Sequence, residues 1–366
     1  MVSRVRVVGA LSRPLSIWPH RPRHTRTITT TTAAEAAAHL LETTTNKIFT
    51  RTQLLDGNQL QKLSLTLNRK ELHPGLDITE NAPPNGTPLP PGYHLVYFTP
   101  SQLEEDLAPD GSDRTFNSPG PFTRRMWAGG RMNWHHDAPP LRVGDEVTET
   151  TQILDVSAKK SRDGSEMVLV DVLKEYFVPG GGRALSDQRS WIFRKPPSPT
   201  HTIASATTSP PPSNIRTSIN DTFPASPSEE EQEGFPTRHI LLSPVALFRF
   251  SALTFNAHKI HYNDPWTRQV ENHPSVVVHG PLNLINMMDY WRDVHSHSSF
   301  SGNPPTSVDY RALSPVYAGD EYTITTASLE AGQSGKKKTA YSKVGLVVEK
   351  RGVVCMRGEV FVEVKR

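Results

Sequence analysis

The sequence predicts an α+β protein built from two similar units, in each of which antiparallel strands enclose a helix. Strand-like alternation of apolar and polar residues fills residues 141–194 and returns after residue 306. Both runs begin with a similar turn, "LRVGDEVTE" in the first and "PVYAGDEYTI" in the second. A repeated turn at the head of two strand runs indicates a duplicated unit, although Gly-Asp is also a common hairpin signal.

The N-terminal segment, residues 1–34, has six arginines and no acidic residue, and Glu35 is the first acid. Without it the formal charge changes from +3 to −3, so the rest of the chain is not basic and a nucleic-acid partner is not expected. Arg-rich, Ser/Thr-rich and acid-free composition is typical of a mitochondrial transit peptide, with a disordered basic tail as the alternative. We therefore expect the protein in the mitochondrial matrix.

The first folded unit should span residues 35–194. "AAEAAAHLLETTT" predicts a short helix, and a second follows in which Leu60, Leu63 and Leu67 recur at helical spacing. The Pro-rich stretch that comes next should be irregular as far as the apolar "HLVYF". Alternating strands then run to residue 194, and residues 195–238, rich in Pro, Ser and Thr, predict a disordered linker.

The second unit should span residues 239–366. It opens with a short strand and the loop "RFSALTFNAHKIHYND", followed by a helix "GPLNLINMMDYWRDVH" and then strands. The single cysteine, Cys355, lies in an alternating strand and should be a small buried hydrophobe. No apolar run approaches the roughly 20 residues of a membrane span, so we expect none.

The loop of the second unit carries side chains suited to catalysis. It resembles the signature of the MaoC-like (R)-specific enoyl thioester hydratases, which have the hot-dog fold. The sequence agrees with that signature at four positions: Phe250, Leu253, Thr254 and His261, which falls on the catalytic histidine. It departs from it at three: Phe255 in place of Gly, Asn256 in place of the catalytic Asp, and His258 in place of Asn.

The variant "FNAHKIHY" is similar to one branch of that family, the mitochondrial hydroxyacyl-thioester dehydratases type 2 and the mesaconyl-CoA hydratase-like proteins. "PFTRRMWAGGRMNWHHDAPPLRVGDEVTE", residues 121–149, resembles the first half of the same branch. The resemblance covers residues 89–366 except the linker and implies a double hot-dog fold. Because the first half has no counterpart of the loop, we expect one active site per chain. The resemblance implies that the degenerate half houses the acyl tail.

Hydration of an enoyl thioester needs a group that takes a proton from water and returns one to the α carbon. His261 suits both tasks, because the pKa of histidine lies near neutrality. Asn256 can orient water or a hydroxyl but cannot take up a proton. The thioester oxygen becomes negative and needs a donor, which the N–H of Gly280 could supply where "GPLN" opens a helix. A structural histidine and a plain tight turn are the alternatives.

Four further residues are candidates for substrate binding: His258, His279, Arg125 and Trp127. His258 could instead hold the loop, and Trp127 could be buried for packing. His258, His261 and His279 could together bind zinc, but no acid flanks them and the stretch is not helical in pattern, so we expect no metal. We expect no cofactor either, since coenzyme A or acyl carrier protein carries the substrate.

We therefore predict a hydro-lyase that interconverts (R)-3-hydroxyacyl and trans-2-enoyl thioesters in mitochondrial type II fatty-acid synthesis. A hydratase for mesaconyl- or itaconyl-CoA is the second candidate and would need a cation at the acyl end of its pocket: Arg124, Arg125 or Arg131. A non-catalytic acyl-thioester binding module is the third, and it would be expected to have lost His261 or Gly280. The sequence leaves a monomer and a homodimer both open.

Overall fold

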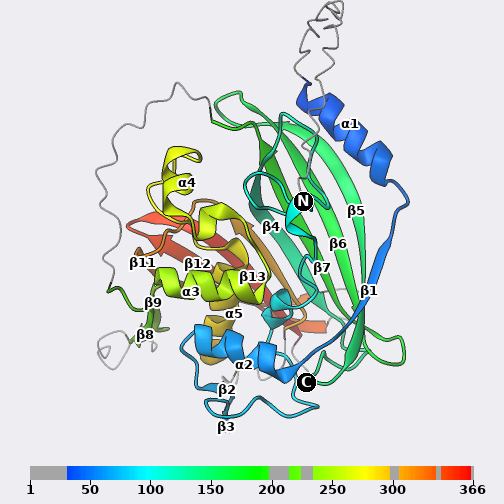
Figure 1. Cartoon of the computed structure of the whole chain (residues 1–366). Coiled ribbons are helices and arrows are strands. Elements are labelled where there is room, and N and C mark those ends of the chain that lie inside the picture. The colour runs from blue at the N-terminus through cyan, green and yellow to red at the C-terminus, as the bar shows by residue number, and fades with distance from the viewer. Residues whose placement is uncertain (1–30, 198–213, 224–233, 297–304, 335–338, 364–366) are drawn as a thin grey trace, which may run out of the picture. The chain divides into compact units, whose positions relative to one another are not determined.

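The structure is a computed structural model. An antiparallel sheet of eleven strands runs through the described part of the chain (Figure 1). The structure describes residues 31–197, 214–223, 234–296, 305–334 and 339–363. The predicted transit peptide therefore lies almost wholly outside the described residues. None of the described helices has the length and apolar character that crossing a membrane requires.

The elements of the N-terminal half precede residue 195. They are α1 (Ala33–Thr44), β1 (Phe49–Leu54), α2 (Gly57–Thr66), β2 (Glu71–His73), β3 (Leu76–Asp77), the 3₁₀ turns η1 (Tyr93–Val96) and η2 (Glu104–Asp106), β4 (Arg124–Trp134), β5 (Glu146–Lys160), β6 (Glu166–Phe177) and β7 (Arg183–Arg194). The C-terminal half follows. Its elements are β8 (Ser218–Thr222), β9 (Thr237–Leu241), α3 (Pro244–Leu253), the 3₁₀ turn η3 (Lys259–His261), α4 (Asp264–Gln269), α5 (Gly280–His295), β10 (Ser307–Ala312), β11 (Glu321–Ser334), β12 (Thr339–Lys350) and β13 (Val353–Glu363).

The strand order confirms the predicted duplication. It reads β1-β5-β6-β7-β4 in one half and, after the β4–β10 junction, β10-β13-β12-β11-β9-β8 in the other, so each half mirrors its partner apart from β8. Both Gly-Asp turns have the same geometry. Asp145 accepts from the backbone N–H of Arg142 at 3.1 Å, and Asp320 accepts from that of Tyr317 at 2.9 Å. Each turn leads into the longest strand of its half.

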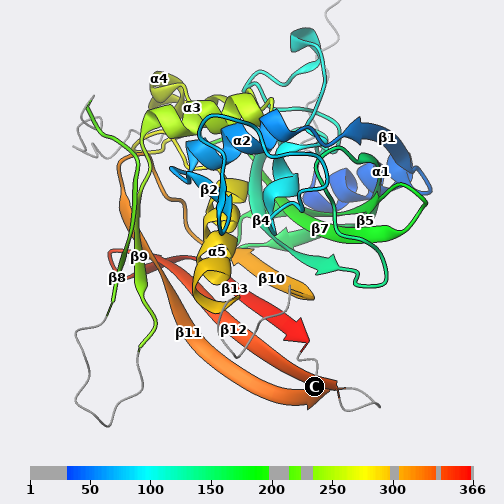
Figure 2. The same cartoon turned by 90° about the horizontal axis from the view of Figure 1, so that it is seen from below.

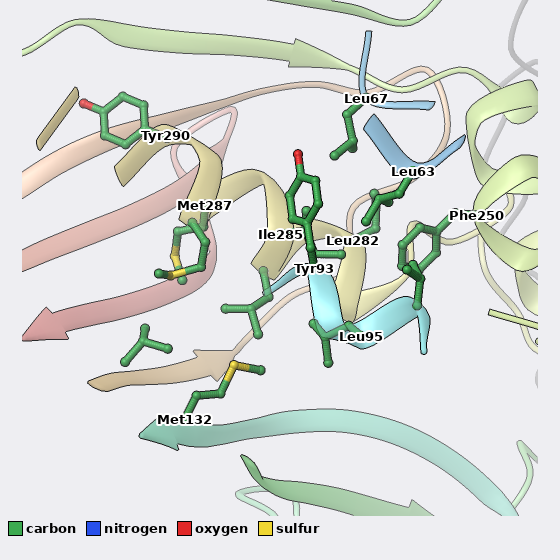
Figure 3. Close-up of a cluster of buried hydrophobic side chains, with 14 of the residues drawn as sticks. Leu63, Leu67, Tyr93, Leu95, Met132, Phe250, Leu282, Ile285, Met287 and Tyr290 are labelled. Carbon is green, nitrogen blue, oxygen red and sulfur yellow. The ribbon is translucent and has the colours of Figure 1, made fainter. Parts of the chain in front are cut away.

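The two halves differ in what their sheet encloses. In the C-terminal half the sixteen-residue α5 lies against the concave face of β11–β13 (Figure 2). In the N-terminal half the corresponding place holds only η1, a single turn. Its Tyr93 donates a hydrogen bond to Asp289 of α5 at 2.9 Å, and Figure 3 shows Tyr93 and Leu95 beside Leu282 and Ile285 of α5. The helix that the first unit was expected to enclose is therefore reduced to one 3₁₀ turn.

A helix that the sequence analysis missed, α3, carries the beginning of the catalytic signature. A strand followed by a loop was expected here. The hydroxyl of Ser243 caps the helix by accepting from the backbone N–H of Ala246 at 3.2 Å, and Pro244 occupies the first turn. Phe250 is fully buried on the helix face that packs against the core. α3 packs against α2, its counterpart in the N-terminal half.

Two predicted boundaries need correction. β8 lies inside the predicted linker and pairs with β9, where the guanidinium of Arg238 binds the carboxylate of Asp221 at 2.7 Å. That part of residues 195–238 is folded, because it extends the sheet. α1 begins at Ala33, before the predicted end of the transit peptide, and its alanines pack on β5 and β6. Cys355 is buried on β13, as predicted.

Candidate active site

A cavity of about 1380 Å³ lies where the segment from α3 to η3 faces the strands of the N-terminal half. All seven residues predicted for the site line it: Arg125, Trp127, Asn256, His258, His261, His279 and Gly280. The fold therefore brings together side chains that are up to about 150 residues apart in the sequence. No group of three or more His, Cys, Asp or Glu side chains suited to a metal ion occurs among the described residues.

The loop between α3 and η3 is held by its own backbone. Phe255 has a φ of 47°, in the left-handed region that glycine adopts most easily, at the position where the family signature has Gly. The backbone N–H of Asn256 then donates to the carbonyl of Ser251 at 2.8 Å. The side-chain oxygen of Asn256 accepts from the backbone N–H of His258 at 3.0 Å, which fixes the direction of its amide and points the NH₂ group away from that bond.

His261 is buried and has a defined tautomer. Its Nδ1 lies 2.8 Å from the carbonyl oxygen of Val277. Because a carbonyl can only accept, Nδ1 carries the proton and Nε2 keeps its lone pair. Burial, and next the neighbouring His258, lower the pKa of His261 to about 3. The imidazole is thus neutral at pH 7, with one nitrogen free to accept a proton.

His279 lies directly behind the His261 ring. The two rings stack with centroids 3.6 Å apart and an angle of 17° between their planes. Nε2 of His279 is 2.9 Å from the hydroxyl of Ser251 on α3, and the residue is only 1% exposed. Burial lowers its pKa well below the usual value, so it too is neutral. This position suits a residue that holds His261 in place better than one that contacts substrate.

His258 connects the loop to a segment of the N-terminal half. Its Nε2 lies 3.4 Å from the carboxylate of Asp110, and the next backbone N–H, of Lys259, donates to the Asp110 carbonyl at 2.8 Å. Burial, followed by the charge of Arg125, lowers the pKa of His258 to about 3. A Cβ on Gly111 would lie 2.0 Å from the carbonyl oxygen of Ala257, so this close approach requires glycine. These contacts support a structural role for His258.

Gly280 and Trp127 touch at the start of α5. A Cβ on Gly280 would lie 3.0 Å from both Cβ and Cγ of Trp127. Gly280 does not have a positive φ, so the glycine serves this close contact rather than an unusual backbone conformation. The contact leaves the first N–H of the helix at the cavity wall, where helix N-termini attract negative charge.

The arginines proposed to bind substrate are already paired. Arg125 binds Asp113 at 2.7 Å, and Arg124 binds Glu271 at 2.5 Å, both beside the cavity. Arg131 pairs with Asp309 at 3.4 Å on an exposed part of β4 and is not a lining residue. The suggestion that Arg131 provides the cation at the acyl end is therefore wrong, because its side chain does not reach the cavity.

Comparison with known proteins agrees with this geometry. The family model described as hydroxyacyl-thioester dehydratase type 2 matches residues 92–318. The chain belongs to the hydroxyacyl-thioester dehydratase type 2 family. It is therefore a hydro-lyase, an enzyme that adds or removes water, as predicted.

Two curated relatives and a solved structure extend the match. The chain is 31% identical to mesaconyl-C(4)-CoA hydratase of Chloroflexus aurantiacus over 66% of its own length and 76% of the relative. It is 27% identical to the mitochondrial hydroxyacyl-thioester dehydratase type 2 of Schizosaccharomyces pombe, over 65% and 77% of the two chains. A solved MaoC-like dehydratase superposes with a TM-score of 0.56 at 16% identity, covering 89% of this chain and all of that one. The double hot-dog fold is confirmed.

The first half of this family member does contain a reduced counterpart of the loop, which the sequence analysis did not find. Nε2 of His73 lies 2.8 Å from the carbonyl oxygen of Pro88, just as Nδ1 of His261 lies 2.8 Å from that of Val277. Pro88 forms an isolated β-bridge with Arg142, and Val277 forms one with Tyr317; each partner is the first residue of the Gly-Asp turn in its half. "TLNRKELHP" and "TFNAHKIHY" share Thr, Asn and His at the same spacing, and this shared pattern was the signal that could have found the counterpart.

The surroundings of His73 differ from those of His261. Arg69, in the same segment, binds Asp293 of α5 through two hydrogen bonds of 2.7 and 2.8 Å, and Arg292 donates to the carbonyl of Leu72 at 3.0 Å. His73 is not among the residues that line the large cavity. Charged contacts thus tie the segment around His73 to α5, and this histidine lies outside the large cavity.

The N-terminal wall of the cavity has a cluster of charged side chains that the sequence analysis also missed. Four charged lining residues form it, Arg51, Glu149, Lys174 and Arg189, together with Thr151. β6 buries every second residue from Val168 to Tyr176, and Lys174 takes one of these inward positions. A lysine in phase with buried valines was the available signal, since charged side chains are seldom buried without a partner.

Proposed function

We propose that the chain interconverts trans-2-enoyl and (R)-3-hydroxyacyl thioesters, with His261 as its acid/base residue. The observation that carries this proposal is the neutral, buried imidazole, which donates from Nδ1 to Val277 and leaves Nε2 free at a cavity lined by the start of α5. A proton acceptor beside a helix N-terminus is what addition of water to an activated double bond requires.

In the hydration direction, Nε2 of His261 takes a proton from water as the water oxygen bonds to the β carbon. The double-bond electrons move onto the thioester, and the N–H of Gly280 stabilises the negative oxygen. The imidazolium then returns its proton to the α carbon, which regenerates the neutral ring. Dehydration follows the same steps in reverse, and the proton removed from the α carbon leaves in the water molecule.

Asn256 orients the water or the 3-hydroxyl group in this scheme. Its oxygen already accepts from the His258 backbone, so its NH₂ group is the part available to donate to a substrate oxygen. His279 supports the catalytic ring from behind, while Trp127 and Arg125 border the thioester.

Two settings agree with different observations. The mitochondrial relative from fission yeast and the arginine-rich N-terminus support a role in mitochondrial type II fatty-acid synthesis, in the matrix. The match to a mesaconyl-C(4)-CoA hydratase, together with the charged N-terminal wall, supports a substrate whose acyl group carries a carboxylate. The substrate reaches the site as a thioester of coenzyme A or of acyl carrier protein, and no cofactor enters the scheme.

The test is the loss of enoyl-thioester absorbance on hydration, measured with crotonyl-CoA and its longer homologues. We expect His261→Ala to lower kcat by about a thousandfold or more, because the acid and the base are lost together. Near-normal turnover by this variant would refute the assignment. Absence of turnover by the wild-type protein with every enoyl thioester, CoA-linked and carrier-linked, would instead favour a non-catalytic binding module.

A further inference from the structure

The charged cluster on the N-terminal wall is built around Glu149. Lys174 donates to Glu149 at 3.0 Å and to Thr151 at 3.1 Å, and the Nε of Arg51 donates to Glu149 at 3.1 Å. Lys174 is only 7% exposed and Glu149 only 3%, so these charges lie inside the protein. We call Arg51, Lys174 and Arg189, with their partner carboxylates, the cationic wall.

Arg189 extends this wall toward the catalytic residues. Its guanidinium binds Asp187 at 2.6 Å, and it lies over the ring of Trp127, 5.6 Å from the ring centroid. Trp127 in turn contacts Gly280. The cationic wall is thus continuous, through one aromatic ring, with the start of α5.

The wall has more positive than negative charge. Its three cations face two carboxylates, Glu149 and Asp187, and the adjacent His94 is neutral because burial lowers its pKa. The imbalance continues around the whole cavity, whose described lining includes eight Arg and Lys residues against three Asp and Glu residues. Burial and the charge of Arg189 lower the pKa of Lys174 to about 8, as expected for a cation without enough compensating negative charge.

The wall also has donors to spare. Among the described residues, two of the three N–H groups of Lys174 are used, and Arg51 uses Nε on Glu149 and one terminal nitrogen on the carbonyl of Thr99. An apolar chain end on this surface would remove water from the charged groups without replacing its hydrogen bonds. A carboxylate would supply both the missing charge and the missing acceptors.

We propose that the cationic wall binds a carboxylate at the far end of the substrate's acyl group, so that the preferred substrates are thioesters of unsaturated dicarboxylic acids. This inference rests on the proposed hydration activity and deepens it. Lys174 and Arg51 are the residues that bind the carboxylate, and Arg189 contributes positive charge from beside Trp127. The phosphates of coenzyme A are a second source of negative charge, but Glu149 and Lys174 at the centre of the wall lie on inward-facing strand positions, whereas large hydrated phosphates favour a cavity mouth.

The wild-type protein provides the first test. Hydration rates are measured for four-, six- and eight-carbon enoyl-CoA thioesters in matched pairs, one ending in a methyl group and one in a carboxylate. We expect the carboxylate member to have a kcat/KM about 10- to 100-fold higher at one of these lengths. The same preference should appear with pantetheine thioesters, which lack the phosphates at the nucleotide end.

Two matched variants make the test specific. Lys174→Met removes the charge but keeps the length of the side chain, and it should lower the carboxylate-to-methyl ratio of kcat/KM about tenfold, chiefly through KM. Lys343→Met is the control. Lys343 is also a strand lysine paired with glutamates, Glu330 at 3.0 Å and Glu359 at 3.3 Å, but it does not line the cavity. It should leave the ratio unchanged.

The outcomes separate the two proposals. Hydration of methyl-ended thioesters with no carboxylate preference at any length would overturn the carboxylate site and leave the proposed activity intact. If Lys174→Met lowered kcat/KM equally for the methyl-ended and carboxylate-ended substrates, and pantetheine thioesters showed no carboxylate preference, the wall would bind phosphate instead. If neither member of any pair is hydrated, the proposed function itself is wrong.

Discussion

Replacing Gly280 by alanine tests whether the start of α5 acts on the thioester oxygen. The new Cβ would lie 3.0 Å from Trp127, about 0.4 Å closer than the 3.4 Å at which ordinary contact begins. Either the indole or the helix start must move by about that amount. A misplacement of about 1 Å costs on the order of a hundredfold in rate, and loss of one oxyanion donor costs about 10²–10³. We therefore expect kcat to fall about 10- to 100-fold, with a smaller change in KM.

The assay is steady-state hydration of crotonyl-CoA, with thermal unfolding measured in parallel. Overpacking costs about 1–3 kcal/mol of stability, so Gly280→Ala should also lower Tm by several degrees. Gly358→Ala is the control: its Cβ would meet Met287 of α5 at 2.4 Å, away from the cavity. It should lose stability and keep kcat within about threefold. A Gly280→Ala enzyme with wild-type kcat would refute the donor role and leave Gly280 only its packing against Trp127.

Two other perturbations give independent checks. Asn256→Ala should lower kcat about tenfold, because a hydrogen bond to the substrate oxygen is lost. Asn256→Asp should keep part of the activity. If the alanine variant were as slow as His261→Ala, Asn256 would instead be essential to proton transfer. The second check concerns stability and pH. The pKa values of His258 and His261 are lowered to about 3, so below pH 6.5 the unfolded chain binds protons that the folded protein does not. The free energy of unfolding should therefore fall between pH 6.5 and 5, by up to about 1.4 kcal/mol per pH unit for each buried histidine. Denaturant unfolding at the two pH values measures it, and a flat profile would show that these imidazoles titrate normally.

The sequence predicted those parts of the site whose signals are local. The motif "GPLN" predicts the start of a helix, and α5 does begin at Gly280. His261 was found from its spacing to Phe250 within one short signature. Asp110 could not be found in this way, because its contacts with His258 and Lys259 join segments about 150 residues apart. Nothing in the residues around Asp110 indicates a partner so distant.

Other features were not predicted because tertiary contacts outweighed the local preference of the sequence. The first unit was expected to enclose a helix, but its Pro-rich approach to Tyr93 allows only η1, and contact with α5 stabilises that single turn. β8 was assigned to a flexible linker on composition, yet pairing with β9 and the bond from Arg238 to Asp221 order it. Amino-acid composition indicates the average entropy lost when a segment becomes ordered, but it does not reveal a single ion pair that stabilises the ordered state.

The asymmetry of the two halves agrees with the expectation of one active site per chain, and it leaves room for a substrate beside His261. Both halves have a histidine bonded to a carbonyl that precedes the inner helix or turn, so they share this framework. In the N-terminal half, the ion pair of Arg69 with Asp293 ties the segment of His73 to α5. The shortened η1 leaves the concave face of β5 and β6 open, and that face lines the cavity in front of His261. The short η1 of one half therefore leaves space beside the loop of the other half, and the charged side chains on that face are the ones that we propose to select the acyl group.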